Sequence, residues 1–304
     1  MRYRIVVNPV AGRGRGARLW PEVAAELERL GVTFEAHFTA GPGDATAAAR
    51  RAAGEGFEAV VAAGGDGTLT EVVNGLAGTG LPLGVLPMGS GNDFARTAGI
   101  DLNPVAAARL LARPFPHPID LGRADGRLFI NVASAGMDAE IARVMNEDLR
   151  CLRGAPAYVV ATFATLLRFR PAAIVLELDG VAHELRAVLV AVGNGRFYGG
   201  GMMITPQAEL DDGLFDVCVL GPLGRIEFGR AFPSVYRGAH LSHPKITSYR
   251  ARRVVLRAAG DESFLAQADG EIIGRLPLEF VVEPAALTLL GPEGGEGSVG
   301  SHGG

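Results

Sequence analysis

The first part of the chain alternates between short apolar runs and segments in which apolar residues recur with helical spacing. This pattern predicts strands over residues 4–8, 32–39, 59–63 and 83–86, and helices over residues 17–30, 44–54 and 68–76. Strands that alternate with helices are typical of a parallel sheet with helices on both faces. We therefore expect a three-layer α/β domain.

From about Ile119 the pattern changes, and predicted strands follow one another mostly without intervening helices. The strands are expected over residues 128–133, 174–178, 185–192, 215–220, 253–258, 264–267 and 278–282, with helices over 138–145 and 156–168. This spacing is typical of an antiparallel β-rich domain. We expect an α/β domain over residues 1–120, a β-rich domain over 121–290 and a flexible, Gly/Glu/Ser-rich tail over 291–304.

Composition limits the functional classes. The chain has 304 residues, of which 48% are apolar, and a net charge of −4, which suits a globular protein of two domains and argues against nucleic-acid binding. Cys151 and Cys218 are isolated, so we expect core residues in a reducing compartment, with no disulfide or zinc site. No uncharged apolar stretch reaches the ~18 residues of a spanning helix, and no signal peptide precedes the first strand. We expect a cytoplasmic protein with at most peripheral membrane contact.

The basic residues and histidines exclude some familiar sites. Lys245 is the only lysine, so a P-loop is absent, and nucleotide phosphates would have to be bound by backbone amides, arginine and metal. His240 and His243 lie in a predicted Pro/Ser loop without acidic neighbours, and we expect both on the surface.

The run Gly64-Gly65-Asp66-Gly67-Thr68 follows a predicted buried strand and opens a helix. Its glycines permit close approach of the backbone to an anion, and the amides at the start of the helix favour phosphate. Asp66 is costly beside phosphate unless it meets a magnesium ion or a proton donor such as an acceptor hydroxyl. The structural alternative is a tight strand–helix turn capped by Thr68.

Two similar turns follow the neighbouring strands. One contains Gly89, Ser90, Gly91 and Asn92 before a helix, and the other runs from Asn8 to Gly12. Turns after adjacent parallel strands converge on one crevice, which is where open α/β sheets bind ligands. The overlapping stretch from Gly12 to Ala17 also fits a GxGxxA dinucleotide fingerprint, but the second strand ends in Phe38-Thr39 without the acidic residue that this motif expects. A Rossmann oxidoreductase is therefore disfavoured.

Two acidic turns occur in the β-rich part. Carboxylates and carbonyls cluster from Glu209 to Leu214, which suits a hard cation such as Mg²⁺, although a solvated hairpin turn explains this segment equally well. Glu271 lies in an ordinary-looking turn and becomes a candidate general base only if the fold brings it against the first domain.

Taken together, these motifs resemble the diacylglycerol kinase catalytic-domain family, which includes bacterial diacylglycerol kinases, YegS-type lipid kinases, sphingosine kinases and ceramide kinases. The resemblance rests on blocks in the family's order over nearly the whole chain: Val7-Asn8-Pro9, Gly64–Thr68, Glu71–Gly75, Leu86–Arg96, Gly193-Asn194-Gly195, Leu210–Gly213 and Asp269-Gly270-Glu271. It implies a nucleotide-binding α/β domain joined to a β-sandwich that binds lipid, with ATP in the cleft between them.

The resemblance also implies roles for individual residues. Those expected to bind ATP are Asn8, Thr39, Gly64, Gly65, Asp66, Gly67, Thr68, Leu69, Thr70, Ser90 and Asn92. Asp212, with the carbonyls of Glu209 and Leu214, matches the family's magnesium site, and Glu271 its proton acceptor. Thr70 departs from the usual asparagine, which leaves that contact open. The implied reaction is direct phosphoryl transfer, in which a lipid hydroxyl deprotonated by Glu271, with Asp66 and metal nearby, attacks the γ-phosphate.

The partners that the resemblance implies are a membrane lipid and, through peripheral contact, a bilayer surface. The apolar segment 155–169 either docks on the bilayer or lines an acyl pocket, with a core helix as the alternative. Diacylglycerol, phosphatidylglycerol and sphingoid bases all remain possible acceptors, and the oligomeric state stays open, with a homodimer among the options. Two rival functions are an NAD kinase, which the Gly89–Phe94 block disfavours, and a catalytically silent lipid-binding regulatory protein, which retention of Asp66, Asp212 and Glu271 disfavours.

Overall fold

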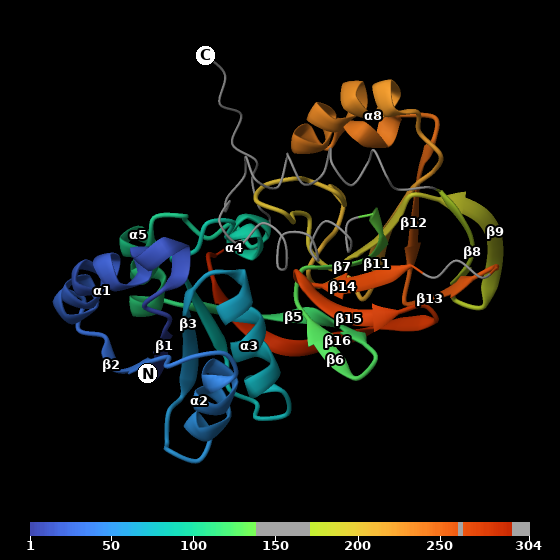
Figure 1. The fold of residues 1–304 in the computed structure, drawn as a ribbon. Helices are drawn as coiled ribbons and strands as arrows, with labels where there is room; N and C mark the ends of the chain where they lie inside the picture. Colours follow the sequence, from blue (N-terminus) through green and yellow to red (C-terminus); the bar gives the residue numbers. More distant parts are fainter. Residues whose placement is uncertain (138–170, 261–263, 294–304) are drawn as a thin grey trace. The chain divides into compact units, whose positions relative to one another are not determined.

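The computed structural model describes residues 1–137, 171–260 and 264–293. The chain forms two compact units, one with Met1–Ile119 and the residues from Ala285 on, and one with Asp120–Pro284 (Figure 1). The predicted helices over 138–145 and 156–168, the apolar segment 155–169, Cys151 and nearly all of the predicted tail lie outside the described residues.

The first unit is built on a parallel sheet. Its strands lie in the order β2 (Thr33–Phe38), β1 (Arg2–Val7), β3 (Ala59–Gly64) and β4 (Leu83–Pro87). Its helices are α1 (Ala11–Arg29), α2 (Asp44–Ala52), α3 (Asp66–Leu76), α4 (Asp93–Thr97) and α5 (Pro104–Ala112). Figure 1 shows α1 and α5 on one face of the sheet and α2 and α3 on the other. This arrangement confirms the three-layer α/β prediction.

Helix α1 begins differently from the prediction, which placed its first residue at Ala17. The element starts at Ala11, but Gly12, Arg13 and Gly14 have positive φ angles of 56°, 64° and 80°, so regular helix begins only after them. Helix α5 was not predicted, although Pro104 in its first turn and the Asn103 side chain, which accepts the Val105 N–H at 3.0 Å, are ordinary start signals.

The second unit contains two antiparallel sheets. One has the order β16 (Leu278–Gly291), β13 (Arg253–Ala258), β8 (Ala172–Leu178), β9 (Val181–Ala187). The other has the order β12 (Ile246–Ala251), β11 (Phe215–Leu220), β10 (Leu189–Gly193), β7 (Val132–Gly136), β14 (Leu265–Ala268), β15 (Glu271–Arg275). Strand β5 (Phe115–Ala124) pairs with β16 and with β6 (Arg127–Phe129).

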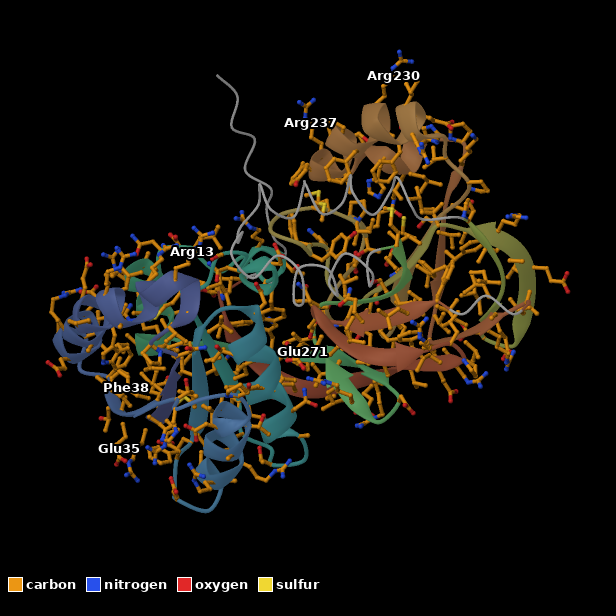
Figure 2. All side chains as sticks on the ribbon, in the orientation of Figure 1. Arg13, Glu35, Phe38, Arg230, Arg237 and Glu271 are labelled. Carbon is orange, nitrogen blue, oxygen red and sulfur yellow. The ribbon has the colours of Figure 1, made fainter. Side chains whose placement is uncertain are left out.

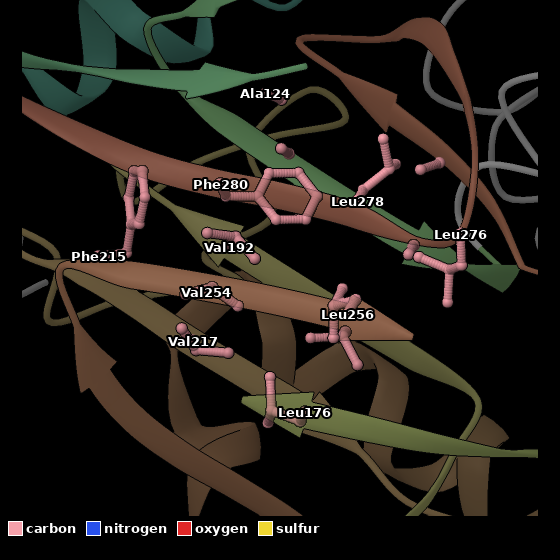
Figure 3. Packing of buried hydrophobic residues seen from close by; sticks show 14 of the residues in the cluster. Ala124, Leu176, Val192, Phe215, Val217, Val254, Leu256, Leu276, Leu278 and Phe280 are labelled. Atoms are coloured by element: carbon pink, nitrogen blue, oxygen red, sulfur yellow. The ribbon is translucent and has the colours of Figure 1, made fainter. Parts of the chain in front are cut away.

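Side chains from both sheets share one apolar core, as Figure 3 shows for Leu176, Val254 and Phe280 from one sheet and Val192, Phe215 and Val217 from the other. The rings of Phe129 and Phe215 stack with their centroids 5.6 Å apart. Two sheets with a common dry interior form a β-sandwich. The predicted all-β second domain is therefore confirmed.

Two predicted strands are each two strands in the structure. The run over 185–192 divides between β9 and β10, which belong to different sheets, and the N–H of Val188 between them donates to Leu220 O at 2.8 Å. The run over 128–133 divides between β6 and β7, because the N–H groups of Ile130 and Asn131 turn to the carboxylate of Asp269. An unbroken apolar run conceals such a change of sheet. The strand predicted over 278–282 continues to Gly291, past Pro284.

A helical layer covers the outer face of the second sheet. It consists of α8 (Arg225–Ala231) and the short 3-10 helices η1 (Phe232–Arg237) and η2 (Ala239–Ser242), none of which was predicted. Phe228 and Val235 of this layer pack on Leu189 and Leu220 of the sheet. His240 also belongs to the layer and is only 4% exposed, so the prediction of a surface histidine was wrong there. The sequence around His240 has only isolated apolar residues together with Ser and Pro, and such a pattern does not predict a buried side chain.

Candidate functional site

Three turns follow the carboxyl ends of β1, β3 and β4. Strand β1 lies between β2 and β3, so the chain leaves β1 toward one side and returns to β3 on the other. Ligands of open α/β sheets bind where the strand order reverses in this way, outside the carboxyl ends. The turns at Asn8–Gly12 and Gly64–Thr68 flank that position.

The glycines let these turns touch backbone to backbone. Met88 N–H donates to Gly64 O at 2.8 Å. A Cβ atom at Gly89 would lie 2.4 Å from Gly65 Cα, and one at Gly12 would lie 2.5 Å from Met88 O. Any larger residue at Gly12 or Gly89 would therefore force the turns apart. The predicted convergence of the three turns is present in the structure.

Asn8 fixes the first turn to the start of α3. Its Nδ2 donates to Thr68 Oγ1 at 2.9 Å, and its Oδ1 accepts the Val10 N–H at 3.1 Å. The Asn8 side chain is thus a brace between two turns, and its polar atoms serve the backbone and a neighbouring side chain.

Asp66 links the second and third turns. Its Oδ2 accepts the N–H of Asn92 at 2.8 Å, and its Oδ1 accepts the N–H of Asp93 at 2.8 Å and of Phe94 at 3.4 Å. Burial raises the pKa of Asp66, while these backbone hydrogen bonds act in the opposite direction. The carboxylate compensates the amides at the start of α4, so Asp66 has partners within the protein.

Asn92 closes the third turn. It is buried, with φ at 55°, and its side chain brackets Gly89, with Oδ1 accepting the Gly89 N–H at 2.9 Å and Nδ2 donating to Gly89 O at 3.2 Å. Ser90 lies exposed at the tip of this turn. Asn92 therefore shapes the loop, and Ser90 is the side chain that the loop presents.

The other residues predicted to contact the nucleotide also fall into two groups, those whose side chains are buried within the protein and those that are exposed on the turns. The side chains of Leu69 and Thr70 are buried, and Thr70 Oγ1 donates to Asp66 O at 3.1 Å. Gly67 is exposed, and the N–H groups of Gly67 and Thr68 belong to the first turn of α3, where a helix supplies no backbone partner. Thr39 follows β2, where its N–H donates to Val7 O at 2.9 Å. The turns can thus bind an anion through main-chain amides.

In the second unit, hydrogen bonds join the three motifs that the sequence singled out. Asn194 Nδ2 donates to Asp120 O at 3.0 Å and to Ile130 O at 2.9 Å. Asp120 Oδ2 accepts the Gly213 N–H at 2.6 Å, and the Asp120 N–H donates to Leu210 O at 2.6 Å. Asp120 was not predicted as a site residue. An isolated acid within a strand gives no signal of this role.

The third motif belongs to the same network. The carboxylate of Asp269 accepts the N–H groups of Ile130 at 2.9 Å, Asn131 at 3.0 Å and Val132 at 3.1 Å. Glu271, two residues on, begins β15 and forms an ion pair with Arg127 of β6. The half-exposed carboxylate of Glu271 is therefore held on a rigid hairpin.

The candidate metal ligands lie in an acidic loop, and Arg250 of strand β12 forms an ion pair with that loop. Asp212 Oδ1 accepts the Leu214 N–H at 2.9 Å, and Asp212 Oδ2 is paired with Arg250. Asp216 is buried, and its Oδ2 lies 3.4 Å from Arg250 Nε without a hydrogen-bond partner in the described part of the chain. Burial and the negative charge of Glu209 raise the pKa of Asp216 to about 6. Residues 1–137, 171–260 and 264–293 hold no cluster of three acidic, histidine or cysteine side chains arranged for a metal.

An apolar pocket lies between the helical layer and the second sheet of the second unit. Its wall includes Met137, Leu189 and Ile204 on the sheet side and Phe228, Ala231 and Val235 on the helical side. Among the described residues of that wall, only Tyr198 and His240 carry an ionisable side chain. His240 Nε2 lies 3.0 Å from Ile204 O, and burial lowers the pKa of this histidine. The sequence analysis did not foresee this pocket in the described part of the chain.

The comparisons with known proteins agree with this architecture. Residues 2–124 match the family described as diacylglycerol kinase catalytic domain, and residues 131–291 match the YegS C-terminal NAD kinase beta sandwich-like domain. The chain is 36% identical over 283 residues to a diacylglycerol kinase of Bacillus subtilis, covering 92% of this chain and 93% of that protein. It is 34% identical over 297 residues to a diacylglycerol kinase of Mycobacterium tuberculosis, covering 95% of each.

Solved structures show the same fold. A crystal structure from Bacillus anthracis superimposes with a TM-score of 0.82 at 26% identity and covers 97% of this chain and 98% of its own. Among the described residues, no helix has both the length and the apolar character needed to cross a bilayer. With both family matches in the predicted order and the relatives aligned over nearly the whole chain, this chain belongs to the diacylglycerol kinase family of lipid kinases.

Proposed function

We propose that the chain transfers the γ-phosphate of ATP to the hydroxyl of diacylglycerol or a closely related lipid. The observation that carries this proposal is the contact of three glycine-bearing turns at the switch point of the parallel sheet, braced by Asp66 through its hydrogen bonds to Asn92 and Asp93. The acceptor follows from the family and from the relatives named diacylglycerol kinase.

In this proposal the phosphates of ATP lie against the amides of Gly67 and Thr68 and beside Ser90, which are the groups that the turns present. The remaining predicted contacts, such as Asn8, Thr70 and Asn92, act by shaping the turns, since their side chains bond within the protein. Thr39, Gly64 and Gly65 would contact ATP through main-chain atoms. Asp66 acts as a positioning residue, because its two oxygens hold the third turn.

The acidic loop fits a magnesium ion. Asp212 and the carbonyls of Glu209 and Leu214 would hold it, and the unbonded Oδ2 of buried Asp216 nearby indicates an excess of negative charge that Arg250 and Arg196 offset only in part. A magnesium ion held by these residues would supply positive charge of the kind that phosphoryl transfer requires. Cation binding would compete with Arg250 for the carboxylate of Asp212.

The chain's own contribution to the chemistry is proton transfer and orientation. Glu271 is the proposed base, which takes the proton of the lipid hydroxyl as that oxygen forms its bond to the γ-phosphorus and the bond to the ADP oxygen breaks. Arg127 orients the Glu271 carboxylate through its ion pair. Backbone amides of the turns oppose the negative charge that spreads over the phosphoryl oxygens.

The apolar pocket under α8 and η1 is the proposed site for an acyl chain. Its wall is almost wholly apolar, as a hydrocarbon ligand requires, and a generic apolar wall would accept acyl chains of several lipids. An apolar pocket does not distinguish one lipid head group from another. The preference for diacylglycerol therefore rests only on the relatives.

Incubation of the purified chain with Mg²⁺ and γ-labelled ATP tests the function. Parallel reactions should contain diacylglycerol, phosphatidylglycerol, a sphingoid base or NAD. We expect label in phosphatidic acid and none in NADP. Label in NADP would instead identify an NAD kinase, and lipid binding without any labelled product would identify a silent lipid-binding protein.

A further inference from the structure

The helical layer of the second unit is rich in positive charge. Residues 222–245 contain four Lys and Arg residues and a single acid, Glu227, whereas the whole chain has a net charge of −4. Glu227 is already neutralised, since its Oε2 accepts hydrogen bonds from Lys245 Nζ at 2.7 Å and from the Gly224 N–H at 3.0 Å. Glu227 therefore does not offset the charges of Arg230 and Arg237 in this layer.

Arg230 of α8 and Arg237 of η1 carry this excess outward. Both are exposed, and neither forms an ion pair with any residue that the structure describes. Figure 2 shows both side chains directed away from the ribbon of the second unit. Exposed arginine side chains without an ion-pair partner are available to bind an anion outside the protein.

Exposed apolar side chains accompany these arginines. Ile226 of α8 is 74% exposed and Tyr236 of η1 is 40% exposed. Large apolar residues next to cations on one surface are typical of helices that lie in a membrane interface, where the rings and aliphatic chains enter the boundary and the cations meet lipid phosphates. We call Ile226, Arg230, Tyr236 and Arg237 the α8–η1 face.

The opposite side of the same layer lines the apolar pocket. Phe228, Ala231, Phe232 and Val235 alternate in sequence with the residues of the α8–η1 face and point to the pocket. The layer therefore separates the pocket from the surroundings by about one helix thickness. A lipid that reaches this pocket from a bilayer meets this layer.

We propose that the α8–η1 face docks on a bilayer containing anionic phospholipid and so presents the pocket to membrane lipids. Arg230 and Arg237, which pair with no residue that the structure describes, select an anionic surface, and Ile226 and Tyr236 add apolar anchoring that a soluble acidic polymer would not use. The role of the docked pocket rests on the proposed function, whereas the docking itself does not.

Sedimentation with vesicles tests the docking. The full chain is mixed with vesicles of phosphatidylcholine alone or with vesicles that also contain phosphatidylglycerol, whose negative surface potential attracts basic residues. We expect binding to the anionic vesicles that weakens with added salt, and a loss of apparent affinity of at least about tenfold in Arg230→Glu/Arg237→Glu. Ile226→Asp should also weaken binding.

Matched controls change equal charge and polarity elsewhere. Arg50→Glu/Arg113→Glu alters two exposed arginines of the first unit, and Val181→Asp alters a residue of β9 that is 59% exposed. Both should bind vesicles like the wild type. Equal binding by Arg230→Glu/Arg237→Glu and wild type would overturn the proposal, as would binding to heparin with none to anionic vesicles.

Measurements of turnover distinguish a failure of the membrane docking from a failure of the proposed lipid kinase function. With a soluble short-chain diacylglycerol, Arg230→Glu/Arg237→Glu should match the wild type, while with long-chain diacylglycerol in anionic vesicles it should be slower. If the wild type binds vesicles through this face but labels no lipid, the docking stands and the proposed function fails. If the variant loses activity on both acceptors alike while binding vesicles normally, the docking fails.

Discussion

The carboxylate of Asp66 accepts the main-chain N–H of Asn92 at 2.8 Å and thereby ties the turn after β3 to the turn after β4. This contact changes how the acid in the Gly-Gly-Asp-Gly-Thr run is understood. The sequence suggested an acid that needs a metal or a hydroxyl, whereas the structure provides three backbone donors. Asp66 would contribute to the proposed phosphate site by holding the turns after β3 and β4 together.

Asp66→Ala should therefore affect both stability and transfer. Removal of the carboxylate leaves backbone donors unsatisfied, which should lower the free energy of unfolding by about 1–3 kcal/mol and reduce kcat/KM by at least about 100-fold. Urea unfolding and steady-state kinetics check both effects. Lost activity at unchanged stability would point to direct contact with the reacting groups, and near-normal turnover would contradict any role.

Gly89→Ala should separate the two glycine turns. The added Cβ would lie 2.4 Å from Gly65 Cα, so the backbone must move, at a cost of about 1–3 kcal/mol. We expect ATP affinity, measured by calorimetry, to fall at least about tenfold, because the amides no longer face one anion. The control is Gly54→Ala, whose Cβ meets only Arg51 O at 3.7 Å and should change neither quantity.

Glu271→Gln should slow the chemical step while sparing nucleotide binding. A glutamine of the same shape cannot take the proton of the hydroxyl, so kcat should fall by about 100-fold or more, with the KM for ATP unchanged. Arg127→Gln, which frees the Glu271 carboxylate from its ion pair, should have a smaller effect. A Glu271→Gln enzyme with wild-type kcat would exclude this residue as the base.

Arg250→Gln should strengthen binding of Mg²⁺. Arg250 is paired with Asp212 and lies 3.4 Å from Asp216 Oδ2, so its removal makes the acidic loop more negative. We expect the Mg²⁺ concentration that half-saturates the thermal shift to fall by about tenfold. Asp212→Asn should abolish the shift, and Arg186→Gln on β9 should leave it as in the wild type. No change in Arg250→Gln would place the ion elsewhere.

His240 should make the protein less stable in mild acid. Burial lowers the pKa of His240 in the folded state, so between that value and about 6.5 the unfolded chain binds a proton that the folded chain does not. The free energy of unfolding should therefore fall as the pH drops below about 6.5. His240→Gln should lose this part of the pH dependence, as followed by urea unfolding from pH 7.5 to 5.0. His183→Gln, at a position that is not buried, should retain it.

The sequence alone determined the two fold classes and the positions of the glycine-bearing turns. Apolar periodicity is a local property, so alternating elements in residues 1–120 and successive strands after them could be recognised without tertiary contacts. Glycines at Gly65 and Gly89 likewise mark positions where two backbones meet. The family's blocks then indicated the activity.

Only the tertiary structure decided where the chain changes sheet and what the polar residues contact. The apolar run through Val188 belongs to two sheets, and His240 is buried although it lies in a stretch with Ser and Pro that resembles a surface loop. Asp66 had an obvious type and position, but its partners lie 26 to 28 residues away. Such contacts depend on which elements pack together, and this is information that local periodicity does not contain. Asp66 could be selected from the sequence, but its bond to Asn92 could not.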